Sequence, residues 1–177
     1  RIEMLGEILE NVRSRSPLIQ NITNYVTAND CANITLACGA SPTMSDGEEE
    51  AEEMGRLCDG LNINMGTLHP RSVKAMLLAG KSAGSCGHPI VLDPVGAGAS
   101  THRRETAEQL LREIPFTAIR GNISEIKTIA GGKNRSRGVD ADASDAVNSG
   151  NLEETIRFAA EFSKRSGAVI AVSGAID

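Results

Sequence analysis

The chain has 177 residues and a formal net charge of −5, and its 40% hydrophobic and 23% charged residues are typical of one globular domain with a sizeable core. The acidic balance, without a long basic run, argues against nucleic acid as a partner. Aromatic residues make up only 2% of the chain and no stretch is long and apolar enough to cross a bilayer, so we expect no membrane partner.

Helical and extended patterns alternate along the chain. In chain order they predict a helix at 1–14, a strand at 18–22, a helix at 24–38, a short extended piece at 40–44, a helix at 48–58, a strand at 61–64, a helix from Pro70, a strand at 89–92, a helix at 101–114, a strand at 116–119, a helix from Asn122, a helix at 152–164 and a strand at 168–172. The whole of 1–177 is predicted to form a single domain of the α/β class with a mostly parallel sheet.

Several of these segments carry more specific expectations. We expect Val26 and Ile34 to face the core from the second helix, and the Gly-rich residues 80–87 to end the helix that begins at Pro70. The strand at 168–172 has no polar alternation, which predicts that it is buried on both faces. Residues 131–150 are rich in Gly, Asp, Ala and Ser and are expected to form a long loop or a lid.

The stretch from 90 to 125 is the most informative part of the sequence. Its two strands end near charged residues, Asp93 and Arg120, and each leads through glycine into the start of a helix. Ligands of parallel sheets bind at the carboxyl ends of the strands. Free N–H groups at a helix start attract anions, and an acidic side chain can hold the counter-cation. The stretch therefore suits a polyphosphate bound with a metal ion.

Each of these signals also has a plainer interpretation. Asp93 before Pro94 could simply accept hydrogen bonds within a turn, and Asn122 with Glu125 could be a capping box, which is the favoured reading from local physics alone. Arg120 could be a surface charge. The glycines of 96–98 lack the third glycine of a dinucleotide-binding loop.

Two other motifs are rejected. Gly80-Lys81-Ser82 resembles the end of a Walker A loop but lacks the earlier glycine, and 80–84 matches a nucleophile elbow but follows a helix, where an elbow follows a strand. The three histidines are scattered, which predicts neither a metal site nor a triad. The four cysteines show no C-x-x-C spacing, so we interpret them as buried free thiols of a reducing cytoplasm.

Taken together, five blocks resemble the hydroxyethylthiazole kinase family. They are SPLIQNITN at 16–24, GASPTM at 39–44, NMGT at 64–67, DPVGAG at 93–98 and RGNISE at 120–125. The resemblance runs along nearly the whole chain in the right order. It implies a ribokinase-like fold and a cytoplasmic enzyme of thiamine (vitamin B1) biosynthesis and salvage. Such an enzyme uses ATP and Mg²⁺ to phosphorylate the hydroxyl of 4-methyl-5-(2-hydroxyethyl)thiazole, in homotrimers whose sites lie between subunits.

The resemblance also assigns roles to individual positions. Met44, Asn24 and Gly66 fall on positions that bind the thiazole, and Arg120, Asn122 and Ser173 on positions that bind ATP. Asp93 and Glu125 fall where the family serves magnesium and phosphate. Ser173 stands where threonine is common in the family, and it keeps the hydroxyl.

One part of the family pattern is absent from these residues, namely the Gly-rich turn that forms an anion hole for the γ-phosphate. Family members continue past the position of Asp177, so we expect the C-terminal part of the domain, and the catalytic residue with it, to be missing from this chain. Two alternatives stay open: a non-catalytic nucleotide- or thiazole-binding fragment, and a related pyrimidine kinase of the same pathway.

Overall fold

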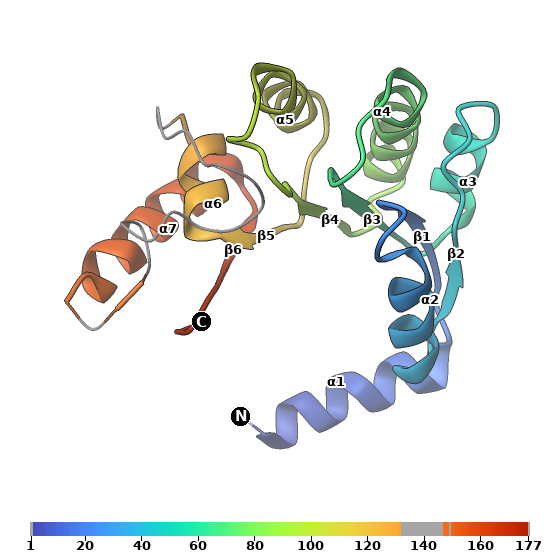
Figure 1. The fold of residues 1–177 in the computed structure, drawn as a ribbon. Coiled ribbons are helices and arrows are strands. Elements are labelled where there is room, and N and C mark those ends of the chain that lie inside the picture. Colours follow the sequence, from blue (N-terminus) through green and yellow to red (C-terminus); the bar gives the residue numbers. More distant parts are fainter. Residues whose placement is uncertain (1, 132–146, 149, 177) are drawn as a thin grey trace.

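The computed structural model describes residues 2–131, 147–148 and 150–176, so most of the loop expected at 131–150 lies outside the described residues (Figure 1). The described elements alternate as predicted. They are α1 (Ile2–Arg15), β1 (Leu18–Ile22), α2 (Ala28–Ala37), β2 (Ser41–Thr43), α3 (Ala51–Leu57), β3 (Gly60–Asn64), α4 (Pro70–Ser85), β4 (Ile90–Asp93), α5 (Thr101–Glu113), β5 (Ala118–Asn122), α6 (Ile123–Ile129), α7 (Leu152–Ser166) and β6 (Val169–Ser173).

The six strands form one sheet in the order β2-β1-β3-β4-β5-β6, and every neighbouring pair is parallel. The chain first moves outward from β1 to β2, then crosses back to β3 and continues the other way. Because such crossovers are right-handed, the reversal puts α2 on one face and the later helices on the other. Figure 1 shows α1 and α2 on one side of the sheet and α3 to α7 on the other. The direction changes between β1 and β3, which is where sheets of this type bind ligands.

The core lies between the sheet and the helices α3 to α7. Buried strand residues such as Ile63, Leu92 and Ile119 pack there against helix residues such as Met76 and Leu110. Of the glycines expected to end α4, Gly80 and Gly84 lie inside it because the helix continues to Ser85, whereas Gly87 follows its end with a φ of 73°, as expected of a terminating glycine. Gly80 permits close packing there, because a Cβ at this position would come within 2.3 Å of Ile114 Cδ1.

The expectation for the second helix was wrong. α2 begins at Ala28 and has no buried residues, and Val26 is 87% exposed. The helix starts late because Asn24 Oδ1 accepts hydrogen bonds from the backbone N–H groups of Val26 and Thr27, which holds the chain in a turn. Ile34 is exposed as well, so the apolar face of α2 points away from the core.

The predicted burial of the last strand was also wrong. β6 lies at the edge of the sheet, where α6 and α7 contact it, and its side chains alternate between exposed and half-buried. Val169 is 65% exposed because it points to the face of β6 opposite those helices. The four cysteines are free as predicted, but only Cys58 is buried. Within the described ranges, no helix is long and apolar enough to span a membrane.

Candidate active site

Polar side chains gather on one face of the sheet, opposite the face that α3 to α7 cover. We call this the open face and define it by Asn64, Asp93, Arg120 and Ser173. Buried Leu92 and Ile119 are register partners on the helical face, so the residues that follow them, Asp93 and Arg120, point the other way. The register also pairs Asn64 with Asp93, and Asn122 with Ser173. Four strands therefore bring their polar ends to one place, as the sequence predicted.

Asp93 ends β4 and is held from both neighbouring strands. Its Oδ2 atom accepts a hydrogen bond from Asn64 Nδ2 at 3.1 Å and a weaker one from Arg120 Nη1 at 3.5 Å. Burial raises the pKa of Asp93, and the nearby Arg120 charge and the Asn64 hydrogen bond partly oppose the rise. Both side-chain contacts use the same oxygen, which leaves Oδ1 the better placed to meet a cation.

Glu125 lies in the first turn of α6 and is 5% exposed. Its Oε2 accepts from the backbone N–H of Asn122 at 2.9 Å, while the Asn122 side chain accepts from the backbone N–H of Glu125, which confirms the predicted capping box. Its Oε1 accepts from the backbone N–H of Gly96 in the loop after β4. Burial raises the pKa of Glu125, two backbone N–H groups oppose the rise, and the neighbouring Asp93 charge adds to it.

These two carboxylates can be tested as magnesium ligands. Among the described residues, no group of three or more His, Cys, Asp or Glu side chains is placed to hold a metal ion. Mg²⁺ in phosphate sites commonly uses only one or two carboxylates, with water and phosphate completing its shell. Asp93 and Glu125 are hard oxygen donors, and the Asp93 charge adds to the rise in the pKa of Glu125. A cation there would relieve that repulsion, so this pair fits magnesium.

The other side of the site lies at the switch between β1 and β3. Asn24 Nδ2 donates to Asn64 Oδ1 at 2.9 Å, and the backbone N–H of Gly66 donates to the same oxygen at 2.8 Å. Gly66 is packed tightly against Asn24, because a Cβ on Gly66 would lie 2.7 Å from Asn24 Cβ. The structure thus brings two of the three expected thiazole positions together.

The third expected thiazole position, Met44, lies at the edge of the sheet, beside β1. It follows β2, and β1 and β3 separate that strand from β4. Met44 is 40% exposed, and the segment after it is held by Gln20, whose Nε2 donates to the Ser45 carbonyl. Within one chain, Met44 and Asp93 therefore belong to separate ends of the site.

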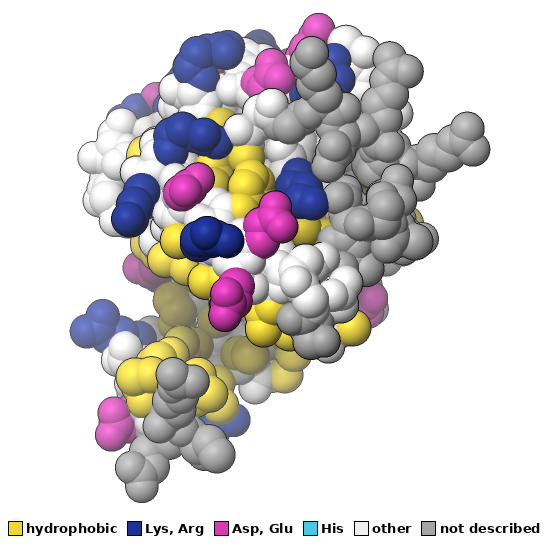
Figure 2. Space-filling model, turned by 90° about the vertical axis from the view of Figure 1, so that its left-hand side faces the viewer, with side chains coloured by type: hydrophobic (Ala, Val, Ile, Leu, Met, Phe, Trp, Pro, Cys, Tyr) yellow, Lys and Arg dark blue, Asp and Glu magenta, His cyan; other side chains and the backbone are white. Residues whose placement is uncertain are grey.

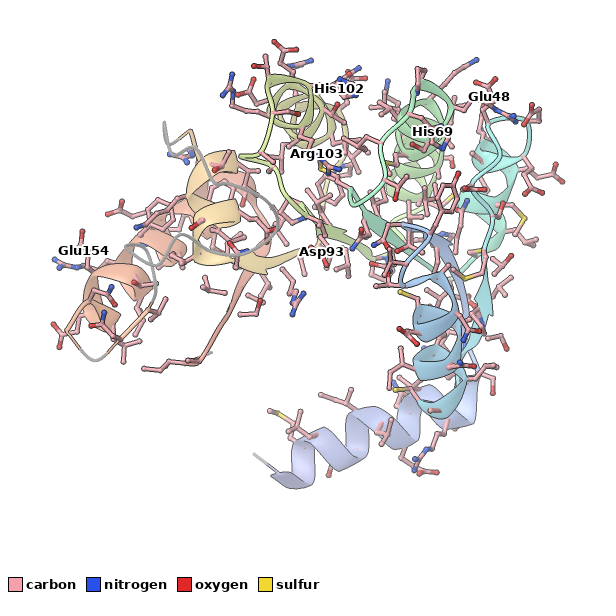
Figure 3. The ribbon with its side chains drawn as sticks, in the orientation of Figure 1. Glu48, His69, Asp93, His102, Arg103 and Glu154 are labelled. Carbon is pink, nitrogen blue, oxygen red and sulfur yellow. The ribbon has the colours of Figure 1, made fainter. Side chains whose placement is uncertain are left out.

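Sequence reasoning missed Arg103. This half-buried residue in the first turn of α5 donates from Nη1 to the carbonyls of Met65 at 2.6 Å and Val95 at 3.0 Å, and from Nη2 to the carbonyl of Gly66 at 2.7 Å. Figure 3 shows Arg103 between α5 and α4, on the helical side of the sheet from Asp93. It ties the loop after β3 to the loop after β4.

A signal for Arg103 was present in the sequence. The first turn of α5 carries His102, Arg103 and Arg104 and no acidic residue. Cations at a helix N-terminus oppose the helix dipole, so a cluster of them there needs another reason. Carbonyl groups of nearby loops supply that reason for Arg103.

Comparison with known proteins gives one consistent result. The model of the hydroxyethylthiazole kinase family matches residues 9–177. A protein of Clostridium acetobutylicum named hydroxyethylthiazole kinase is 60% identical over 174 residues, and one of Desulfovibrio desulfuricans with the same name is 50% identical over 174 residues. The solved structure of a hydroxyethylthiazole kinase protein from Pyrococcus horikoshii superposes with a TM-score of 0.83 at 38% identity.

The matches differ in how much of each chain they cover. Each of the three covers 98% of this chain, but only 64%, 61% and 61%, respectively, of the relative. The chain thus spans about three-fifths of the length of the relatives it matches. The superposition at this TM-score supports the same arrangement of sheet and helices over the shared part.

Proposed function

The chain belongs to the hydroxyethylthiazole kinase family, and from this premise we propose that the protein transfers the γ-phosphoryl group of ATP to the hydroxyl of 4-methyl-5-(2-hydroxyethyl)thiazole, as a step in thiamine biosynthesis. The observation that carries the proposal is the line of hydrogen bonds from Asn24 through Asn64 to Asp93, with Arg120 on the same carboxylate. It joins the expected alcohol-binding side to the expected phosphate side at the carboxyl ends of the strands.

On the phosphate side, the chain supplies charges and dipoles of both signs. Asp93 and Glu125 would hold Mg²⁺, which when bound neutralises charge on the β- and γ-phosphates. Arg120 extends from β5 with a planar guanidinium that suits phosphate oxygens, and Asn122 and Ser173 face the same region from paired strand positions. Phosphoryl transfer depends mainly on such positioning and charge stabilisation.

On the alcohol side, Asn24 and Gly66 would line the thiazole pocket and Met44 would pack its thioether against the flat ring.

Because Met44 lies across β1 and β3 from Asp93, we propose that neighbouring subunits complete one another's sites in a homotrimer. Exposed apolar side chains support contacts of this kind, and Figure 2 shows hydrophobic side chains on the lower part of the molecule, where α1 lies. Those of α1 are Met4, Leu5 and Ile8, and those of α2 and the turn before it are Tyr25, Val26, Ile34 and Leu36. Native mass spectrometry of the purified protein tests the trimer. We also propose a cytoplasmic location, because ATP is the phosphoryl donor of the proposed reaction.

The activity is tested directly by incubating the purified full-length protein, the one that contains this chain, with ATP, Mg²⁺ and the thiazole alcohol, and by following the phosphorylated product by mass spectrometry. A hydroxymethylpyrimidine of the same pathway serves as the competing substrate. We expect turnover of the thiazole alcohol and a fall of roughly 10²-fold or more in the Asp93→Ala variant. Preferred turnover of the pyrimidine, or full activity of that variant at saturating Mg²⁺, would contradict the proposal.

A further inference from the structure

Asn64 ends β3 beside the switch between β1 and β3, and its amide contacts both halves of the site. Its Oδ1 accepts from Asn24 Nδ2 and from the backbone N–H of Gly66, and its Nδ2 donates to Asp93 Oδ2. We propose that Asn64 is a positioning residue that holds the carboxylate side and the alcohol side of the site in a fixed relation. This inference rests on the proposed function.

The orientation of the Asn64 amide follows from its partners. Two donors, the Asn24 amide and the Gly66 N–H, converge on one atom at 2.9 and 2.8 Å, so that atom is the oxygen. The NH₂ group then faces Asp93, whose carboxylate can only accept. Asn64 is 9% exposed. Leaving one of its buried polar groups without a hydrogen bond would lower the free energy of unfolding by more than the loss of a hydrogen bond on the surface does.

The three bonds act on three separate segments. Asn24 holds the turn before α2 through its own oxygen, Gly66 begins the loop before α4, and Asp93 ends β4. The peptide units on both sides of Gly66 are held, because Asn64 accepts from its N–H while Arg103 donates to its carbonyl at 2.7 Å. A shift of the Asn64 amide would therefore move the Gly66 loop and the Asp93 carboxylate together.

The chain offers a matched control two residues earlier on the same strand. Asn62 points to the same face as Asn64, but its Nδ2 donates to Asn21 Oδ1 at 3.1 Å, away from Asp93. Changes of Asn62 and Asn64 thus alter the same residue type in the same strand and sheet. Only the change at Asn64 breaks a bond to a proposed site residue.

Two substitutions separate the two halves of the Asn64 amide. Asn64→Asp keeps an acceptor for Asn24 and Gly66 but replaces the donor to Asp93 with a carboxylate oxygen that repels Asp93, so we expect kcat to fall ~10–100-fold while the KM for the thiazole alcohol stays within about threefold. Asn64→Ala removes both contacts, so kcat falls similarly and that KM rises by about tenfold or more. Asn62→Asp and Asn62→Ala should change either constant by about twofold or less.

Hydrogen exchange of the Gly66 amide gives a readout that does not depend on turnover. The amide should exchange faster in Asn64→Ala and keep its protection in Asn64→Asp and in both Asn62 variants. Equal kcat and KM effects at Asn62 and Asn64, or a loss of melting temperature without a kinetic change, would overturn the positioning role and leave the proposed function intact. Full-length wild-type protein without thiazole turnover would overturn the proposed function and this inference with it.

Discussion

The carboxylate of Glu125 accepts a hydrogen bond from the backbone N–H of Gly96, with 2.8 Å between Oε1 and N, and so joins the first turn of α6 to the loop after β4. Its other oxygen caps the N–H of Asn122. One buried side chain thereby sets the position of two segments that both belong to the proposed phosphate side. The capping box predicted from the sequence is part of a larger contact, since its glutamate also reaches a second loop.

Glu125→Gln should lower the free energy of unfolding by about 1–3 kcal/mol, because one backbone N–H would then face an NH₂ group in a buried place. Urea unfolding at neutral pH measures the loss. Glu105→Gln, on the exposed face of α5, is the control and should leave stability within about 0.5 kcal/mol. Equal stability of the two variants would mean that the Gly96 contact contributes nothing to folding.

Asp93→Asn should cost activity but not stability. Burial raises the pKa of Asp93, so the folded wild-type protein binds a proton more tightly than the unfolded chain does. That contribution to stability is complete below the unfolded pKa and is lost as the pH rises through the folded one. The unfolding free energy of wild-type protein should therefore fall relative to that of Asp93→Asn as the pH rises from about 4, the usual pKa of an unfolded Asp side chain, toward neutrality.

Urea unfolding of both proteins across this range is the measurement for Asp93, and Asp30→Asn on the exposed surface of α2 is the control. A wild-type advantage that grows toward alkaline pH would show that the Asn64 and Arg120 contacts outweigh the burial of the charge.

Arg103→Met should loosen the loops after β3 and β4, because the three carbonyls that the guanidinium binds would lose their donor. We expect the free energy of unfolding to fall by about 1–3 kcal/mol and the KM for the thiazole alcohol to rise. Arg103→Lys should show smaller changes of both kinds, because its ammonium group is charged but lacks the planar geometry of the guanidinium. Arg104→Met, in the same helical turn, is the matched control. Identical thermal melts and kinetics for the two methionine variants would exclude this role.

Met44→Ala should raise the KM for the thiazole alcohol more than the KM for ATP, since the side chain is 40% exposed after β2 and contributes little to the core. Loss of a thioether contact with a flat ring is worth roughly 0.3–1.5 kcal/mol, or up to about tenfold in KM. Steady-state kinetics with each substrate varied in turn give the two constants. A raised KM for ATP alone would move Met44 out of the thiazole pocket.

Gly66→Ala should impair thiazole binding, because the new Cβ would meet Asn24 at 2.7 Å and push its side chain from Asn64. The KM for the alcohol is the quantity to measure. Gly6→Ala is the contrasting change: Gly6 lies in α1 with no neighbour within 4 Å of an added Cβ, so it should stabilise the protein by about 0.5–1 kcal/mol and leave kinetics unchanged. A Gly66→Ala enzyme with normal KM would show that Asn24 can move without consequence.

Much of the fold could be predicted because its signals are local. Apolar runs and helical periodicity gave the alternation of elements, and parallel strands then required Asp93 and Arg120 to meet at one edge of the sheet. Periodicity shows which side chains share a face but not whether anything covers that face. For this reason the exposure of α2 and of Val169 was missed.

Contacts between side chains and groups far away in the sequence could not be predicted either. Arg103 donates to backbone carbonyls that lie far from it in the sequence. Every residue has a backbone carbonyl, so the residue types do not indicate which ones an arginine will bind. Asn64 lay within a recognised block, but its two-sided amide became visible only when β1, β3 and β4 were placed side by side. The hydrogen bonds that connect the site are properties of the sheet order, which no single segment of sequence contains.

The position of β6 has a consequence for the route by which the protein folds. Its only strand partner in the described sheet is β5, and α7 together with a long stretch of chain lies between the two in the sequence. Closing so large a loop costs conformational entropy before the strand pairing can stabilise it. The loop between β3 and β4 is shorter, since one helix joins them, so its closure costs less entropy. The strand that carries Ser173 is therefore expected to dock late, so one wall of the proposed nucleotide site is assembled only after the asparagines and Asp93 have met.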